Sequence, residues 1–157
     1  MIQLKKILHP SDFSEPSIQA LKYAQALCAR FQSELHLLHV VSRVPAVPLG
    51  TGAGFVPPNV ATSQDDFRKN AGEQLGQLID PDWAAEHSMV QATVEGSPTP
   101  GIIEYAQEHD IDLIVLGTHG RNALKQVLIG SVAERIVRQA PCPVLTVRPD
   151  GHQFVMP

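Results

Sequence analysis

Short, mostly apolar runs recur at regular intervals along the chain. In the runs at 34–41 and 113–116, odd and even positions are both largely apolar. This pattern is typical of strands that are buried on both faces of a parallel sheet. It predicts five strands, at residues 4–9, 34–41, 89–95, 112–117 and 144–147.

Between these runs the apolar residues return at helical spacing, as Ile18, Leu21 and Leu27 do. This spacing, with the capping residues and prolines beside it, predicts four helices. The first is capped by Ser14 or Asp12, the second spans 63–78, the third begins near Thr99-Pro100, and the last runs from Ser131 to Gln139.

Alternating strands and helices predict an α/β protein with a single doubly wound parallel sheet and helices on both faces. The length of 157 residues fits one domain, and 43% hydrophobic residues is typical of a globular chain. A net charge of -4 gives no basic surplus for a nucleic acid backbone, so we expect no nucleic acid partner.

No apolar run reaches the roughly 18 residues of a membrane span, and no signal peptide is evident at the N-terminus. We therefore expect no membrane partner and a cytoplasmic location. Cys28 and Cys142 form no CxxC pair and are expected to be reduced thiols. His36 and His39 should point to opposite faces of a strand, and no metal-ligand spacing is present.

The segment with the strongest chemical signal is Gly117-Thr-His-Gly120, nine residues, then Gly130-Ser131. It follows an apolar strand and opens a helix, where glycines allow close backbone approach and free N–H groups attract anions. Ser131 and Glu134 have the spacing of a capping box. The alternative left open is that these glycines only end a strand and begin helices.

The whole spacing closely resembles the nucleotide-binding members of the universal stress protein family. The resemblance also includes Lys6-Ile-Leu-His-Pro-Ser-Asp-Phe-Ser14, Leu35–Val41 and Val94–Pro98, and it covers the chain from Leu4 to Val147. It implies a universal stress protein domain at residues 1–148, with a long Pro/Gly loop at 43–61, followed by a C-terminal tail at 149–157.

The family resemblance implies strand order 3-2-1-4-5, a Rossmann-like, adenine nucleotide alpha hydrolase-like sheet whose crevice lies between the first and fourth strands. Asp12 matches the family's nucleoside-contacting aspartate, and a carboxylate suits ribose hydroxyls or an adenine amino group. Similar proteins present the backbone of the residue at Val40 to the adenine edge. Pro10 and Ser11 would form the adjacent wall. Asp12 as a helix cap is the alternative.

Backbone N–H groups would hold the phosphates in such a pocket, with the hydroxyl of Ser131 as an extra donor. Arg121 suits bidentate phosphate contact, and His119 lies between the glycines. For both, and for Lys125, a solvent-exposed position is the alternative. The expected cofactor-binding residues are Pro10, Ser11, Asp12, Val40, Gly117, His119, Gly120, Arg121, Gly130, Ser131 and Val132.

We expect an ATP-binding stress-response or regulatory module, with ADP or AMP as open alternatives and Mg²⁺ carried by the nucleotide. The chain lacks a Walker A loop and a nucleophile elbow, and no general base is evident, so binding with little or no hydrolysis is expected. Weak ATPase activity, a nucleotidyl-transfer enzyme and a structural dimeric module without nucleotide stay open. The resemblance also implies a homodimer through the last strand, Cys142 to Val147.

Overall fold

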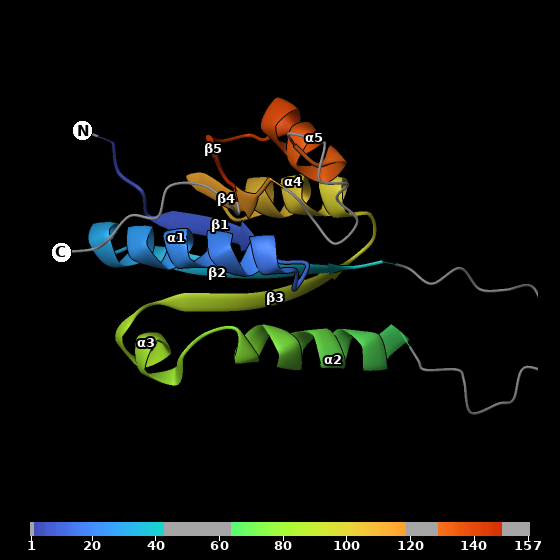
Figure 1. The fold of residues 1–157 in the computed structure, drawn as a ribbon, viewed down its shortest axis with the longest axis horizontal. Helices are drawn as coiled ribbons and strands as arrows, with labels where there is room; N and C mark the ends of the chain where they lie inside the picture. Colours follow the sequence, from blue (N-terminus) through green and yellow to red (C-terminus); the bar gives the residue numbers. More distant parts are fainter. Residues whose placement is uncertain (1, 43–63, 119–128, 149–157) are drawn as a thin grey trace, which may run out of the picture.

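The computed structural model describes residues 2–42, 64–118 and 129–148. Five parallel strands form one sheet in the order β3-β2-β1-β4-β5, which confirms the expected fold class and strand order (Figure 1). The strands are β1 (Lys6–Pro10), β2 (Glu34–Val41), β3 (Met89–Glu95), β4 (Leu113–Gly117) and β5 (Val144–Val147).

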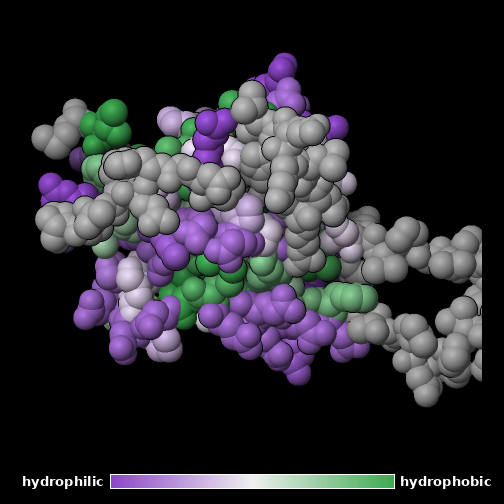
Figure 2. Space-filling view, viewed as in Figure 1, coloured by the Kyte–Doolittle hydropathy of each residue, from purple (hydrophilic) through white to green (hydrophobic). Residues whose placement is uncertain are grey.

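Helices cover both faces of the sheet and enclose two apolar layers. On one face, Ile7 and Leu35 pack with residues of α1 (Glu15–Phe31), α2 (Gln64–Gln77) and α3 (Pro81–Glu86). The outer surfaces of α1 and α2 are polar, and apolar surface is visible between them (Figure 2).

On the other face, Leu8 and Leu38 pack with α4 (Pro98–Glu108) and α5 (Ser131–Gln139).

Among the described residues, no helix is long and apolar enough to cross a membrane. Both cysteines are free thiols. Cys28 lies on the buried face of α1, where burial raises its thiol pKa to about 12.

Helix boundaries differ from the sequence prediction at two points. The short helix α3 was not predicted, because none of its residues is buried and it carries no apolar repeat. Its start is set by the Asp80 carboxylate, which accepts from the Asp82 N–H at 2.8 Å. Helix α4 begins at Pro98, one residue before the predicted start, and its N-cap residue is Ser97, not Thr99.

The predicted capping box at Ser131 is wrong. The N-cap residue of α5 is Gly130, whose carbonyl accepts from the Glu134 N–H at 2.9 Å, so Ser131 is already helical. No side chain caps this helix. The Glu134 carboxylate instead contacts Arg138 one turn later, at 3.0 Å. Of the two caps predicted for α1, Ser14 is the one observed, because its hydroxyl accepts from the Ser17 N–H.

The central strand β1 ends in a proline, which interrupts its ladder to β4. Leu8 is in register with Ile114, so the next main-chain N–H on this side, at residue 10, would donate to the Val115 carbonyl. Pro10 has no N–H. The Nδ1–H of His9 donates to this carbonyl instead, at 2.8 Å. A buried imidazole therefore replaces the missing ladder bond where β1 and β4 separate.

Gly117, the last residue of β4, lies against the first turn of α1. A Cβ atom added to Gly117 would stand 2.8 Å from the carbonyl oxygen of Pro16 and 3.0 Å from its carbonyl carbon. Both atoms belong to the backbone and cannot rotate away. Gly117 is therefore required by the packing of a helix on the sheet, whatever else it does.

We predict that Gly117→Ala lowers the free energy of unfolding by about 1–3 kcal/mol, because the new methyl group must displace α1. Urea unfolding followed by far-UV circular dichroism measures this. Gly72→Ala is the matched control: no atom lies within 4 Å of an added Cβ, and alanine favours helix α2, so stability should rise by up to about 1 kcal/mol. Equal stability of the two variants would contradict the packing argument.

We also predict that His9 makes the protein less stable in mild acid. Its side chain is fully buried, and desolvation lowers its pKa from 6.5 to about 4. The unfolded chain binds a proton between these values and the folded chain does not. The stabilisation is therefore complete above pH 6.5 and is lost as pH falls to about 4, amounting to about 3 kcal/mol.

Urea unfolding at several pH values between 7 and 4.5 checks this. The control is His9→Asn, because an asparagine amide can donate to the Val115 carbonyl but does not titrate in this range. Its unfolding free energy should fall less steeply with acidification than that of the wild type. His36, whose pKa is also lowered by burial, is present in both proteins and cancels. Parallel pH profiles would show that His9 is not the group responsible.

Candidate functional site

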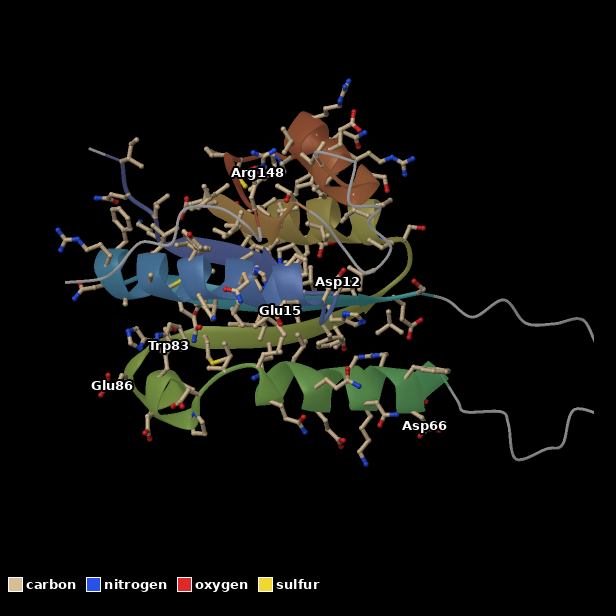
Figure 3. The ribbon with its side chains drawn as sticks, in the orientation of Figure 1. Asp12, Glu15, Asp66, Trp83, Glu86 and Arg148 are labelled. Carbon is tan, nitrogen blue, oxygen red and sulfur yellow. The ribbon has the colours of Figure 1, made fainter. Side chains whose placement is uncertain are left out.

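The candidate site lies at the carboxyl edge of the sheet, where β1 and β4 diverge. Asp12 follows β1, and Thr118 follows β4. The Thr118 N–H donates to Val147 on β5 at 2.9 Å, and the Thr118 carbonyl accepts from the Gly130 N–H at 2.5 Å. The start of α5 is thereby tied to the end of β4. Figure 3 shows Asp12 at this edge and Trp83 at the opposite end of the molecule.

The turn that carries Asp12 is held by local hydrogen bonds. The Asp12 carboxylate oxygen Oδ1 accepts from the Ser14 N–H at 3.0 Å and from the Ser14 hydroxyl. Phe13 has a φ of 64°, in the left-handed region, which non-glycine residues rarely adopt. Its N–H donates to Ser11 Oγ at 3.2 Å. Asp12 therefore braces the residue that caps α1, and Ser14, not Asp12, is the cap.

Ser11 is fixed through its backbone as well as its side chain. Its N–H donates to the Leu38 carbonyl on β2 at 2.8 Å, and its carbonyl accepts from His39 Nδ1 at 2.7 Å. The His39 ring also lies 4.5 Å from the Phe13 ring, centroid to centroid. The pair Pro10 and Ser11, predicted as a wall of the site, lies next to Asp12, with Ser11 buried and Pro10 half-buried.

Val40 presents its peptide groups on the β1 side of β2. The Leu38 carbonyl points to β1, because it accepts from Ser11, whereas the Val41 carbonyl points to β3, where it accepts from Gly96. Peptide groups alternate along a strand, so the N–H and carbonyl of Val40 face the β1 side. Strand β1 ends at Pro10, opposite Leu38, so it does not extend as far as Val40.

The predicted phosphate-binding groups are only partly within the described residues. The first turn of α5 contributes Ser131 and Val132, whose N–H groups precede the first intrahelical hydrogen bond of the helix. The Gly130 N–H was expected to be available for a phosphate, but in the structure it donates to the Thr118 carbonyl. His119, Gly120, Arg121 and Lys125, the 43–61 loop and the 149–157 tail lie outside the described residues.

Sequence reasoning did not find a site role for His9, Ser17 or His39. The Nε2 atom of His9 lies 3.3 Å from Ser17 Oγ, and Ser17 Oγ lies 3.1 Å from Ser11 Oγ. His36 and His39 do point to opposite faces, as predicted: His36 meets Tyr105 of α4, and His39 meets Phe13. A histidine within a buried strand was the available signal, because it must have hydrogen-bond partners there.

The candidate site offers hydrogen-bond acceptors at the Asp12 turn and hydrogen-bond donors at the first turn of α5. Asp12 supplies a carboxylate, and the first turn of α5 supplies N–H groups at the positive end of a helix dipole. A ligand that carries hydroxyl or amino groups on one side and an anion on the other matches both. No cluster of three or more metal-ligating side chains occurs within the described parts of the chain.

The chain is similar to known proteins over most of its length. The sequence profile of the Universal stress protein family matches residues 3–148. Universal stress protein MJ0531 of Methanocaldococcus jannaschii is 32% identical over 145 residues, which cover 92% of this chain and 82% of that protein.

Two solved structures share the fold. Universal stress protein UspA from Lactobacillus plantarum has a TM-score of 0.75 and 28% identity, over 94% of this chain and all of the other. A universal stress protein family protein from Arabidopsis thaliana with AMP bound has a TM-score of 0.58 and 18% identity, over 92% and 91% of the two chains. The chain belongs to the universal stress protein family.

Proposed function

We propose that this protein binds an adenine nucleotide, ATP in the first instance, in the crevice between β1 and β4. Binding would make it a nucleotide-dependent stress-response or regulatory module with little or no hydrolysis. One observation carries the proposal: the Asp12 turn and the first turn of α5 lie at the same edge of the sheet, after the neighbouring strands β1 and β4, although more than a hundred residues separate them in sequence.

The nucleoside would lie against the ends of β1 and β2. The Asp12 carboxylate accepts hydrogen bonds from ribose hydroxyls, and the N–H and carbonyl of Val40 pair with the adenine edge. Pro10 and Ser11 form the wall beside them. This placement puts the negative charge of Asp12 at the end of the ligand that carries no phosphate.

The phosphates would lie at the start of α5, against the N–H groups of Ser131 and Val132. The Gly130 N–H would join them by exchanging its bond to Thr118 for a phosphate oxygen. Gly120, Arg121 and His119 remain proposed contacts, and Gly117 remains the start of this loop. Mg²⁺ would arrive with the nucleotide and keep most of its water ligands. The AMP-bound relative from Arabidopsis thaliana supports an adenine nucleotide as the ligand class.

Hydrolysis needs a positioned water and charge stabilisation at the transferred phosphoryl group. Asp12, the carboxylate of the proposed site, is assigned to the nucleoside end. Among the described residues, His9 is buried beneath the site and holds Val115, so it is not available as a base. This distribution favours binding over turnover.

The proposed assembly is a homodimer that pairs the β5 strands of two copies. β5 is an edge strand, so one side of its ladder is unpaired within the described parts of the chain. Leu145 on β5 and Val137 on α5 are exposed apolar side chains, 37% and 50% accessible. Pairing would satisfy the edge N–H and carbonyl groups and cover these side chains.

Asp12→Asn is predicted to weaken Mg-ATP binding by roughly 10- to 100-fold, because a hydrogen bond to a charged acceptor contributes about 1.5–3 kcal/mol. Isothermal titration calorimetry on nucleotide-stripped protein measures the dissociation constant. Asp82→Asn is the matched control: it makes the same substitution at an exposed carboxylate on α3 and should bind like the wild type.

Gly130→Val tests the phosphate end of the same site. A branched side chain there would obstruct the approach of phosphates to α5, so binding of Mg-ATP should be lost while AMP is affected less. Titrations of the wild type with ATP, ADP and AMP rank the three ligands by dissociation constant. Failure of the wild type to bind any of the three would refute the nucleotide proposal.

Leu145→Lys is predicted to convert a dimer into a monomer, because it places a charge in the proposed strand pairing. Size-exclusion chromatography with light scattering should report twice the chain mass of 17.1 kDa for the wild type and the single mass for the variant. Phe31→Lys is the control, since Phe31 is an exposed apolar residue at the end of α1. A monomeric wild type, or dissociation by both variants, would count against pairing through β5.

A further inference from the structure

His9 is a buried ionisable residue that makes no contact with the proposed ligand. Its side chain is completely inaccessible, and both ring nitrogens have partners. Nδ1 donates to the Val115 carbonyl of β4, and Nε2 lies 3.3 Å from the Ser17 hydroxyl of α1. Ser17, also buried, lies 3.1 Å from Ser11 Oγ. An unbroken chain of polar contacts therefore runs from β4 through α1 to the turn that carries Asp12.

Hydrogen-bond contacts join the members of this chain in sequence. A neutral imidazole that donates through Nδ1 has a lone pair on Nε2, which can accept from the Ser17 hydroxyl. The Ser17 and Ser11 hydroxyl oxygens lie within hydrogen-bond distance, at 3.1 Å, and Ser11 Oγ accepts from the Phe13 N–H. His9, Ser17 and Ser11 are therefore linked by consecutive polar contacts.

Ser11 is consequently held on four sides. Its N–H and carbonyl are bonded to β2, at Leu38 and His39, and its side chain is bonded to Phe13 and Ser17. Three of these bonds belong to β2 or to the turn itself. The bond to Ser17 is the one that relates the turn to β4 and α1, because Ser17, of these four partners, also contacts His9.

We propose that His9 is a positioning residue for the nucleotide site, which acts through Ser17 and Ser11 to fix the end of β1 and Asp12 relative to β4. The inference rests on the proposed adenine nucleotide site. It assigns to one imidazole two separable tasks: completing the sheet at Val115, and holding the binding turn through Ser17.

The first test compares two buried serines. Ser17→Ala cuts the link between His9 and Ser11, whereas Ser33→Ala removes a hydroxyl that is equally buried and donates to the Leu4 carbonyl at the opposite edge of the sheet. Calorimetric titration with Mg-ATP should show a dissociation constant about tenfold higher for Ser17→Ala. Ser33→Ala should stay within about twofold of the wild type, although its thermal unfolding temperature falls comparably.

The second test separates the two tasks of His9. In His9→Asn the amide can still donate to Val115 but is too short to reach Ser17, so stability at pH 7 should be largely kept while Mg-ATP affinity falls as in Ser17→Ala. A double variant, His9→Asn with Ser17→Ala, should bind no more weakly than either single variant, because both changes break the same chain. A purely structural role would leave the affinity of His9→Asn unchanged.

Coupling must also act in the other direction, from ligand to imidazole. Nitrogen-15 NMR of the histidine rings should show the His9 Nε2 resonance, assigned by its loss in His9→Asn, shifting when Mg-ATP is added. The His87 resonance is the internal control, because that ring stacks on Trp83 at the far end of the sheet.

The outcomes distinguish this inference from the proposed function. A wild type that binds no adenine nucleotide refutes the proposed function, and the inference with it. A wild type that binds Mg-ATP, together with Ser17→Ala and His9→Asn variants of wild-type affinity, overturns the inference alone and leaves the nucleotide site standing.

Discussion

The hydrogen bond from His9 to Val115 is the interaction on which this structure most depends. A proline in a central strand removes a ladder donor and would leave a buried carbonyl without a partner. The imidazole supplies the missing donor from the side, at 2.8 Å. The sheet therefore stays continuous up to Pro10, and beyond it β1 and β4 are free to part. The same residue closes the sheet and lies beneath the proposed nucleotide site.

The main strands were predictable because their signal is local. Residues 34–41 and 113–116 are apolar on both faces, which suits only a covered parallel strand, and the observed β2 and β4 follow these runs. The strand order was predictable only through the family resemblance. Helix α3 and the cap of α5 were missed or misassigned for opposite reasons: α3 buries nothing and has no periodicity, whereas Ser131 has the right spacing but lies one residue inside the helix.

Prediction of the site was limited because a sequence motif gives residue types and spacing but not the contacts between separate elements. Gly130 stood out by its spacing and Asp12 through the family resemblance, and the structure places Asp12 after β1 and Gly130 beside the end of β4. The sequence did not distinguish a glycine needed for ligand approach from one needed for packing, and Gly117 is required by the Pro16 carbonyl of α1. The links from His9 through Ser17 to Ser11 depend on side-chain contacts between separate elements, so no spacing rule could have found them. Residues 119–121 stay predictions.

The buried thiol on the inner face of α1 has a practical consequence for the study of motion in this protein. Cys28 is inaccessible, and with its pKa raised to about 12 it forms almost no thiolate at neutral pH. A thiol reagent can modify it only when α1 moves away from the sheet. Cys142, half-buried before β5, is reached by smaller movements. The labelling rate of Cys28 thus measures how often α1 opens from the sheet, and the labelling rate of Cys142 measures how often the β5 edge opens.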